Sequence, residues 1–338
     1  MPDRGTGPAP DWDVIVVGAG PGGAAAAKRC AETGLRTLVL EKRAWPRDKV
    51  CSGMIMGPWA HDIIRDHFGA IPREVLASLP VLKGHFFHVP GAAPAVLEWP
   101  TPLAWRKNLD AWLLQKACAA GAEVRTQARV TQVESHGQII RLTLNGPDGD
   151  EPLSARWVIG ADGANSDIRK VLFPGLKTSY STPIRECYPG SLRLDQNYFH
   201  WFFPKGRPRP RFNVNHKDGF FLIEGSGIRE LRADISRILA DHWFDPSQKP
   251  IWRDGCLIPK LHQNLIESWP RKESSRLPGQ EGRPPVLIWN CCGRSWPRLP
   301  YSFSNRTPSP NPPPRLPWAV TSKTLTKKPC GFPEPISY

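Results

Sequence analysis

A run of glycines near the start of the chain has the spacing of a nucleotide-binding turn. The segment GAGPGG at residues 18–23 follows the pattern G-x-G-x-x-G. The first glycine permits a tight bend, the second lets the backbone approach a diphosphate, and the third lets a helix pack closely on a strand. The free N–H groups at the start of that helix favour phosphate. The predicted cofactor-binding residues of this turn are Gly18, Ala19, Gly20, Pro21, Gly22 and Gly23.

An acid after the next strand completes the signature. Residues 13–17 (DVIVV) read as a buried strand, an alanine-rich helix follows, and residues 36–40 read as a second strand. Glu41 ends that strand 18 residues beyond Gly23, where its carboxylate can accept hydrogen bonds from ribose hydroxyls, and Lys42 beside it is also expected in the site. A carboxylate would repel a 2′-phosphate, so the pattern favours FAD or NAD over NADP. The alternative is a glycine-rich turn that binds nothing.

Two distant segments separate FAD from NAD through a resemblance. Residues 157–169, WVIGADGANSDIR, resemble the Asp-Gly fingerprint of flavoproteins of the p-hydroxybenzoate-hydroxylase-like class. The resemblance implies FAD, with Asp162 and Gly163 at its ribose and pyrophosphate. The sequence R-x-x-L-D that begins at Arg106 resembles a second motif of the class, whose arginine contacts the cofactor. Val130 matches the strand whose backbone meets the adenine; for Arg106, a surface charge ahead of a helix is the alternative.

A cysteine loop narrows the class further. Residues 49–53, KVCSG, resemble the K-x-C-G-G loop of geranylgeranyl reductases, which saturate isoprenoid double bonds with reduced FAD. Ser52 departs from the family pattern, where a glycine stands. The resemblance places Cys51 beside the flavin ring as the candidate for the catalytic site. A small loop thiol with no task is the alternative.

An aromatic strand resembles the lipid pocket of the same family. Residues 199–206, FHWFFPKG, match the motif Y/F-x-W-x-F-P-K-G. Strand alternation puts Phe199, Trp201 and Phe203 on one face, a wall suited to a prenyl chain, and Pro204 follows. An ordinary aromatic core strand is the alternative. The nine histidines suggest no proton donor, because none has a diagnostic partner.

The resemblance to geranylgeranyl reductases implies a reaction. Hydride from reduced FAD would saturate a carbon–carbon double bond of a prenyl or other hydrophobic substrate, with NAD(P)H or a protein electron donor as the reductant. One alternative is an FAD-dependent monooxygenase, and another is a truncated or frame-shifted inactive flavoprotein remnant. A prenyl-lipid substrate would also bring the protein into peripheral contact with a membrane. The sequence indicates no oligomeric state.

The charge of the chain is concentrated at one end. Of the formal net charge of +14, residues 269–338 contribute +8, and they hold 15 of the 38 prolines. We therefore expect a solvated tail rather than a basic groove, and no nucleic-acid partner. The longest uncharged stretch, residues 14–27, is too short and too rich in glycine to span a membrane.

Cysteine usage indicates the compartment. The eight cysteines include no C-x-x-C pair and no Cys/His cluster with zinc spacing, so we expect no metal site and no disulfide framework. We predict a reducing, cytoplasmic location.

The order of elements predicts an α/β fold. A Rossmann-like FAD-binding domain is interleaved with a mixed β-sheet substrate domain. Strand patterns dominate residues 184–223, and residues 228–243 form an amphipathic helical pattern. The expected parts are a disordered leader (1–11), FAD-binding segments (about 12–80 and 105–172), substrate segments (about 81–104 and 173–268) and a disordered C-terminal tail (269–338).

The segment VLIWNCCG at residues 286–293 breaks the class pattern. Flavoproteins of this class carry a strand followed by G-D-A-A-G near this position, and here Val286–Ile288 supplies only the strand. Read one base later, the codons for Trp-Asn-Cys-Cys-Gly give Gly, Ile or Thr, and twice Ala or Val. We therefore hypothesise a shifted reading frame after Ile288. The alternative is a genuine proline-rich tail, in which residues 311–317 form a polyproline II ligand.

Overall fold

The computed structural model describes residues 9–55, 57–136, 138–147, 149–206, 209–226, 228–260 and the backbone of 286–288. The chain divides into two compact units, residues 1–292 and 293–338, and all of these residues belong to the first unit. The predictions about the order and reading frame of the tail, and about most of the leader, lie outside the described residues. No helix in the described part is long and apolar enough to cross a membrane.

The first sheet carries the predicted nucleotide-binding unit. Its order is β5-β2-β1-β8-β7-β6, and β16 pairs with the end of β8. The strands are β1 (Trp12–Val17), β2 (Thr37–Glu41), β5 (Glu123–Thr126), β6 (Arg129–His136), β7 (Ile139–Gly146), β8 (Gly149–Gly160) and β16 (Val286–Ile288). Strands β5, β2, β1, β8 and β16 pair in parallel, whereas β7 and β6 are antiparallel additions. β1 and β2 are nearly continuous apolar runs, and consecutive residues in both strands are buried, so both faces of these two strands lie in the core.

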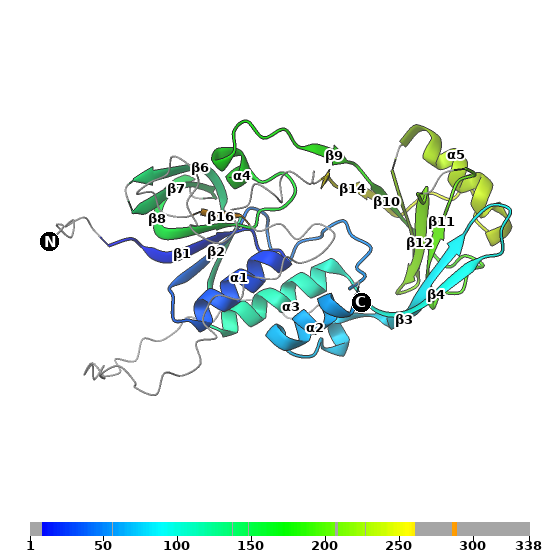
Figure 1. Cartoon of the computed structure of the whole chain (residues 1–338), viewed down its shortest axis with the longest axis horizontal. Helices are drawn as coiled ribbons and strands as arrows, with labels where there is room; N and C mark the ends of the chain where they lie inside the picture. The colour runs from blue at the N-terminus through cyan, green and yellow to red at the C-terminus, as the bar shows by residue number, and fades with distance from the viewer. Residues whose placement is uncertain are drawn as a thin grey trace. The chain divides into compact units, whose positions relative to one another are not determined.

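Two helices cover one face of the first sheet, as Figure 1 shows. α1 (Pro21–Glu32) and α3 (Arg106–Ala119) pack side by side. Ala24 of α1 contacts a cluster that contains Leu109 and Leu113 of α3. The alanines of α1 let these helices approach closely, and this brings the start of α3 near the glycine turn. α2 (Gly57–Phe68) joins the same cluster.

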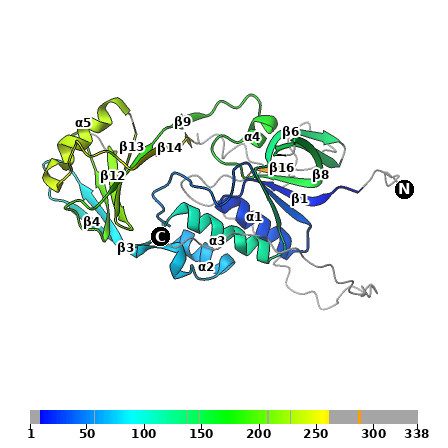
Figure 2. The same ribbon diagram turned by 180° about the vertical axis from the view of Figure 1, so that it is seen from behind.

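The second sheet is mixed and carries the predicted aromatic strand. Its order is β14-β10-β13-β12-β11-β3-β4, with only β11 and β3 pairing in parallel. The strands are β3 (Leu76–His88), β4 (Ala95–Ala104), β10 (Ile184–Pro189), β11 (Tyr198–Phe202), β12 (Phe212–Lys217), β13 (Phe220–Gly225) and β14 (Trp252–Gly255). α5 (Ile228–Leu239) packs on one face through Leu231 and Ile235, against Phe212 and Val214 (Figure 2).

Short elements complete the described part. They are η1 (Arg73–Val75), α4 (Asp167–Leu172), β9 (Ser179–Ser181), η2 (Ala240–His242) and β15 (Ile258–Lys260), with β9 and β15 forming a two-stranded sheet. The fold class predicted from the sequence is confirmed. Two boundaries differ: the second sheet begins at Leu76, and the helix expected over 228–243 ends at Leu239, where a 3-10 turn leads to Trp243 with φ 67°.

Candidate functional site

The glycine turn between β1 and α1 uses its three glycines differently. Gly18 has φ +105°, and a Cβ there would lie 2.4 Å from Ala161 O, while a Cβ on Gly23 would lie 1.7 Å from Gly18 O. Gly18 and Gly23 are therefore required by the fold itself. Gly20 has φ −73°, and a Cβ there would meet only Arg47 Nη2, at 3.3 Å. Gly20 is thus the glycine that the fold does not need, and its lack of a side chain leaves the backbone open to a ligand.

The start of α1 fits a phosphate group. α1 begins at Pro21, and its N-cap residue, Gly20, provides no side-chain hydrogen bond to the first turn. The first N–H groups of a helix lack intrahelical acceptors, so an anion in front of Gly22 and Gly23 can satisfy them. A helix start with this geometry suits a diphosphate.

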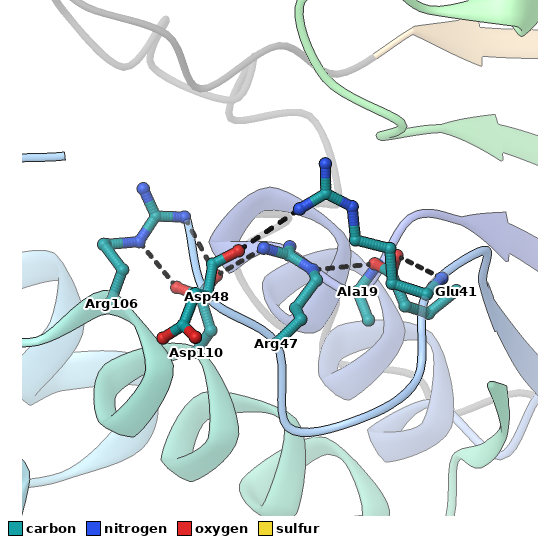
Figure 3. Close-up of polar contacts among 7 residues, drawn as sticks. Ala19, Glu41, Arg47, Asp48, Arg106 and Asp110 are labelled. Atoms are coloured by element: carbon teal, nitrogen blue, oxygen red, sulfur yellow. Dashed lines mark hydrogen bonds and ion pairs between the residues drawn. The ribbon is translucent and has the colours of Figure 1, made fainter. Parts of the chain in front are cut away.

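Glu41 ends β2 beside this turn. Glu41 is only 5% exposed. Its carboxylate accepts hydrogen bonds from Ala19 N (3.2 Å), Arg43 N (3.1 Å) and Arg47 Nε (3.1 Å). A carboxylate offers about four acceptor positions, so these three bonds leave capacity for a hydroxyl. Figure 3 shows Glu41 directed at Ala19 and Arg47. The geometry suits recognition of a ribose next to the diphosphate.

A chain of alternating charges links Glu41 to α3. Arg47 Nε bonds Glu41 Oε2, and Arg47 Nη1 lies 3.4 Å from Oδ2 of the fully buried Asp110. Arg106, the first residue of α3, donates to Asp110 through Nε at 2.7 Å and Nη2 at 2.9 Å (Figure 3). The sequence did not single out Arg47 or assign Asp110 a role. Arg47 reaches the site because the loop after β2 folds back over Gly20.

Asp162 and Gly163 follow β8 and lie beside the glycine turn. A Cβ on Gly18 would lie 2.9 Å from Asp162 Cα. The Asp162 carboxylate accepts from Ser166 Oγ at 2.5 Å and from Asp167 N at 2.6 Å, and so fixes the start of α4. Gly163 has φ +90° and open space where its Cβ would be. The structure therefore brings the Asp-Gly turn to the same edge of the sheet as the glycine turn.

Two other predicted residues lie at the margin of this site. Lys42 is exposed. Burial opposes ionisation of Asp167, but the hydrogen bond and charge of Lys170, with a smaller effect of the Lys42 charge, lower the pKa of Asp167. Val130 is 6% exposed and packs in the core of the first sheet, so its side chain does not face solvent. Only its backbone remains for a contact with adenine, as the resemblance implied.

The cysteine loop connects the first sheet to the second. Cys51 O accepts from Arg185 Nη1 at 3.0 Å, and Ser52 O accepts from Asn215 Nδ2 at 3.3 Å. Gly53 has φ +79°, and a Cβ there would lie 1.8 Å from Ala104 O. The second glycine of the family pattern is therefore the one this loop requires, which explains why Ser52 can replace the first.

The aromatic strand β11 directs Phe199 and Trp201 to the face of the second sheet that α5 does not cover. Register pairs Phe199 with His85 and Trp201 with Phe87, so Phe199 and Trp201 share this face. Phe199 is completely buried in a cluster with Leu82 and Leu103, whereas Trp201 is half-buried and donates to His85 Nδ1 at 3.1 Å. The half-buried residues just beyond the strand are Phe203 and Pro204.

Comparison with known proteins identifies the family. The FAD binding domain matches residues 11–184, about half of the chain. The chain belongs to this FAD-binding family. FAD is therefore the cofactor of this chain.

Relatives of this FAD-binding protein extend the comparison beyond the first sheet. It is 31% identical over 260 residues to digeranylgeranylglycerophospholipid reductase 2 of Methanopyrus kandleri, covering 69% of this chain and 60% of that protein. It is 30% identical over 172 residues to 12-dehydrotetracycline 5-monooxygenase/anhydrotetracycline 6-monooxygenase of Streptomyces rimosus. This match covers 48% of this chain and 34% of that protein. The chain thus spans less than two thirds of the curated relatives it matches.

A solved structure shares the fold of both sheets. It is a geranylgeranyl bacteriochlorophyll reductase-like protein from Thermoplasma acidophilum, with a TM-score of 0.62 and 20% identity. The match covers 82% of this chain and 70% of that one.

Proposed function

We propose that this FAD-binding protein is an oxidoreductase that saturates carbon–carbon double bonds of a prenyl lipid or another hydrophobic substrate. The observation that carries the proposal is the cysteine loop. It runs from the cofactor end of β2 and is hydrogen-bonded at Cys51 and Ser52 to the face of the second sheet that holds Phe199 and Trp201. Cofactor site and aromatic face therefore adjoin one loop. The match to an archaeal prenyl-lipid reductase across 260 residues supports the same reading.

Named side chains of both sheets would have separate roles in this reaction. Bound FAD supplies hydride chemistry once it is reduced by NAD(P)H or by a protein electron donor. The start of α1 and the guanidinium of Arg47 hold the diphosphate, and Glu41 holds the ribose. Arg106 and Asp110 fix Arg47 in place. Trp201 and Phe203 present an apolar wall that orients a prenyl chain and keeps water from the reacting carbons.

We propose that the hairpin between β3 and β4 contacts a membrane surface. Residues 89–97 contain no charged side chain, and Val89, Val96 and Leu97 are 43%, 48% and 44% exposed. Trp243, 73% exposed, lies nearby, because the rings of His88 and His242 are 5.8 Å apart. Exposed apolar groups of this kind mark interaction surfaces, and tryptophan favours the membrane interface.

Basic side chains accompany this apolar hairpin. Arg193 lies 5.6 Å from the centroid of the Trp243 ring. The exposed Lys205 follows Phe203, whose N–H donates to His88 O at 2.9 Å. Apolar groups with flanking cations suit an anionic lipid surface. A membrane-bound prenyl lipid would then be delivered near the aromatic face.

A monooxygenase is the second candidate, favoured by the 172-residue match to the Streptomyces rimosus monooxygenase. The two functions separate in one experiment. The purified chain is loaded with FAD, reduced chemically without oxygen, and mixed with a geranylgeranyl lipid in two parallel samples, one kept free of oxygen and one given oxygen. Reoxidation of the flavin with saturation of the lipid supports the reductase. Reoxidation that requires oxygen and yields a hydroxylated product supports the monooxygenase, and a colourless protein that takes up no FAD supports the inactive remnant.

A further inference from the structure

A buried lysine reaches from the second sheet to the cysteine loop. Lys217, at the end of β12, is 1% exposed. Its Nζ donates to Ala104 O at 3.3 Å and lies 4.5 Å from the centroid of the Trp105 ring. A Cβ on Gly53 would lie 2.6 Å from the same nitrogen. The ammonium group therefore sits against the turn that contains Cys51 and just before the start of α3.

Two buried acceptors stand on the same face of the sheet. Asn213 and Glu224 are directly paired between β12 and β13. Asn213 Oδ1 and Glu224 Oε1 are buried and have no hydrogen-bond partner among the described residues. Because buried polar atoms are nearly always bonded, these oxygens indicate a site that receives a donor. Alternation places Lys217 on this face as well, since Asn213 and Lys217 are four residues apart.

Charged groups of both signs surround Lys217. Arg185 of β10 is the strand neighbour of Glu224 of β13. Its guanidinium forms an ion pair with Asp254 at 2.5 Å and donates a hydrogen bond to Cys51 O. Asp218 bonds Trp105 Nε1 at 2.5 Å and so holds the ring beneath the ammonium group.

Burial tunes the lysine for proton transfer near neutral pH. Burial lowers the pKa of Lys217 to about 8, against the opposing effect of the Glu224 charge. Burial likewise raises the pKa of Glu224, which the Lys217 charge opposes. An acid whose pKa lies near the working pH is well matched to general acid catalysis.

We propose that Lys217 is the acid that protonates the substrate carbon, with Glu224 and Asn213 as positioning residues. The inference rests on the proposed reductase function. One alkene carbon accepts a hydride from reduced flavin, and this C–H bond takes both electrons from the cofactor. The π electrons of the broken double bond then form the second C–H bond with the proton of the Lys217 ammonium group. The amine is left neutral and regains a proton from water, while the flavin ends oxidised and the alkene reduced.

The test uses the full chain loaded with FAD, with the variants Lys217→Met and Glu224→Gln. Glu186→Gln is the matched control, because Glu186 is also a buried acid of the second sheet but pairs with Ile223 on the α5 face. The first readout is the absorbance of bound flavin against pH, without substrate. We expect a transition near pH 8 in the parent. It should be lost in Lys217→Met, shifted to lower pH in Glu224→Gln, and unchanged in the control.

The second readout is the rate of flavin reoxidation by a geranylgeranyl lipid without oxygen. We expect the parent rate to fall as pH rises through the flavin transition, and the Lys217→Met rate to be about 100-fold lower and independent of pH. A Lys217→Met variant that keeps the parent rate and pH profile overturns the assignment. A parent that binds FAD but leaves the lipid unreduced contradicts the proposed function instead, and the flavin titration still decides whether Lys217 faces the flavin.

Discussion

Arg47 joins two acids that come from different parts of the chain: its Nε is 3.1 Å from Glu41 Oε2, and its Nη1 is 3.4 Å from Asp110 Oδ2. All three side chains are at least mostly buried, and Asp110 is completely so. A buried guanidinium beside Gly20 is both a structural clamp and a cation at the entrance to the glycine turn. This dual position predicts that cofactor affinity and stability change together when Arg47 is altered.

We expect Arg47→Met to weaken FAD binding about 10- to 100-fold, because a charge-assisted bond to the diphosphate is lost. The free energy of unfolding should fall by about 1–3 kcal/mol, since Glu41 loses its cationic partner while Asp110 keeps Arg106. Flavin fluorescence titration and urea unfolding measure the two effects. Arg43→Met, in the same loop but exposed, should change neither. Unaltered FAD affinity in Arg47→Met would show that this side chain does not face the cofactor.

The cysteine loop should tolerate change at Ser52 but not at Gly53. An alanine at Gly53 would adopt φ +79° and place its Cβ 1.8 Å from Ala104 O. We therefore expect Gly53→Ala to lower the free energy of unfolding by at least about 2 kcal/mol, and Ser52→Gly by about 0.5 kcal/mol. Urea unfolding of both variants tests this, and equal midpoints would contradict the strain argument.

Local pattern was sufficient to predict much of the fold. The glycine turn, Glu41 and the Asp-Gly turn at Asp162 follow strands, and the carboxyl ends of parallel strands meet at one sheet edge. The order of strands along the sequence was therefore enough to predict that these three features lie close together. The place of Arg47 could not be predicted, because it depends on how an irregular loop folds back across Gly20.

The sequence also could not predict which face of a strand would meet another part of the chain. The alternation of Phe199 and Trp201 predicts a shared face, but Phe199 is fully buried in the described structure, and its role as a pocket wall stays a prediction. Lys217 lies in the segment FNVNHK, where alternation does not say which face meets another part of the chain. Its contact with the cysteine loop is long-range and depends on how the sheets pack together.

A histidine cluster should make stability sensitive to acid. His200 Nε2 lies 2.8 Å from Asp195 O and therefore donates, so in the neutral ring Nδ1 accepts from His88 Nε2 at 2.9 Å. Burial, reinforced by the nearby His200 and His242, lowers the pKa of His88 to about 4, and burial lowers that of His216 to about 4.

A histidine with a lowered pKa in the folded state is charged first in the unfolded chain. The contribution of each buried, neutral histidine to the free energy of unfolding is therefore fully present above its pKa in the unfolded chain, about 6.5. It is lost as pH falls from there to about 4. Each such group contributes at most about 1.4 kcal/mol per pH unit. Urea midpoints between pH 7.5 and 4 should fall less steeply for His88→Gln than for the parent, whereas exposed His136→Gln should match the parent. A slope unaffected by His88→Gln would contradict this account.

The proposed membrane contact predicts that a charge at Val96, but not at the equally exposed Val171, weakens binding to lipid vesicles. Val96→Asp at the hairpin should reduce co-sedimentation with anionic phospholipid vesicles about tenfold, because a charge replaces apolar surface at the interface. Trp243→Ser should act in the same direction. Val171→Asp is the control, since Val171 of α4 is equally exposed, 50% against 48%, but lies outside the hairpin. Equal loss in Val96→Asp and Val171→Asp would argue against the hairpin.

The central claim is that the turn from Gly18 to Gly23 holds the diphosphate of FAD, and Gly20→Val tests it most directly. Gly20 has an ordinary φ, and a Cβ there would meet only Arg47 Nη2, at the far end of a side chain, so we expect the fold to tolerate valine with an unfolding midpoint close to the parent. Gly175→Val, with nothing within 4 Å, is the matched control. The measurement is equilibrium binding of FAD by flavin absorbance and fluorescence. We predict at least about a 100-fold loss of affinity in Gly20→Val alone, because the side chain blocks the approach of the diphosphate to the backbone. A folded Gly20→Val protein that binds FAD as tightly as the parent would contradict the account.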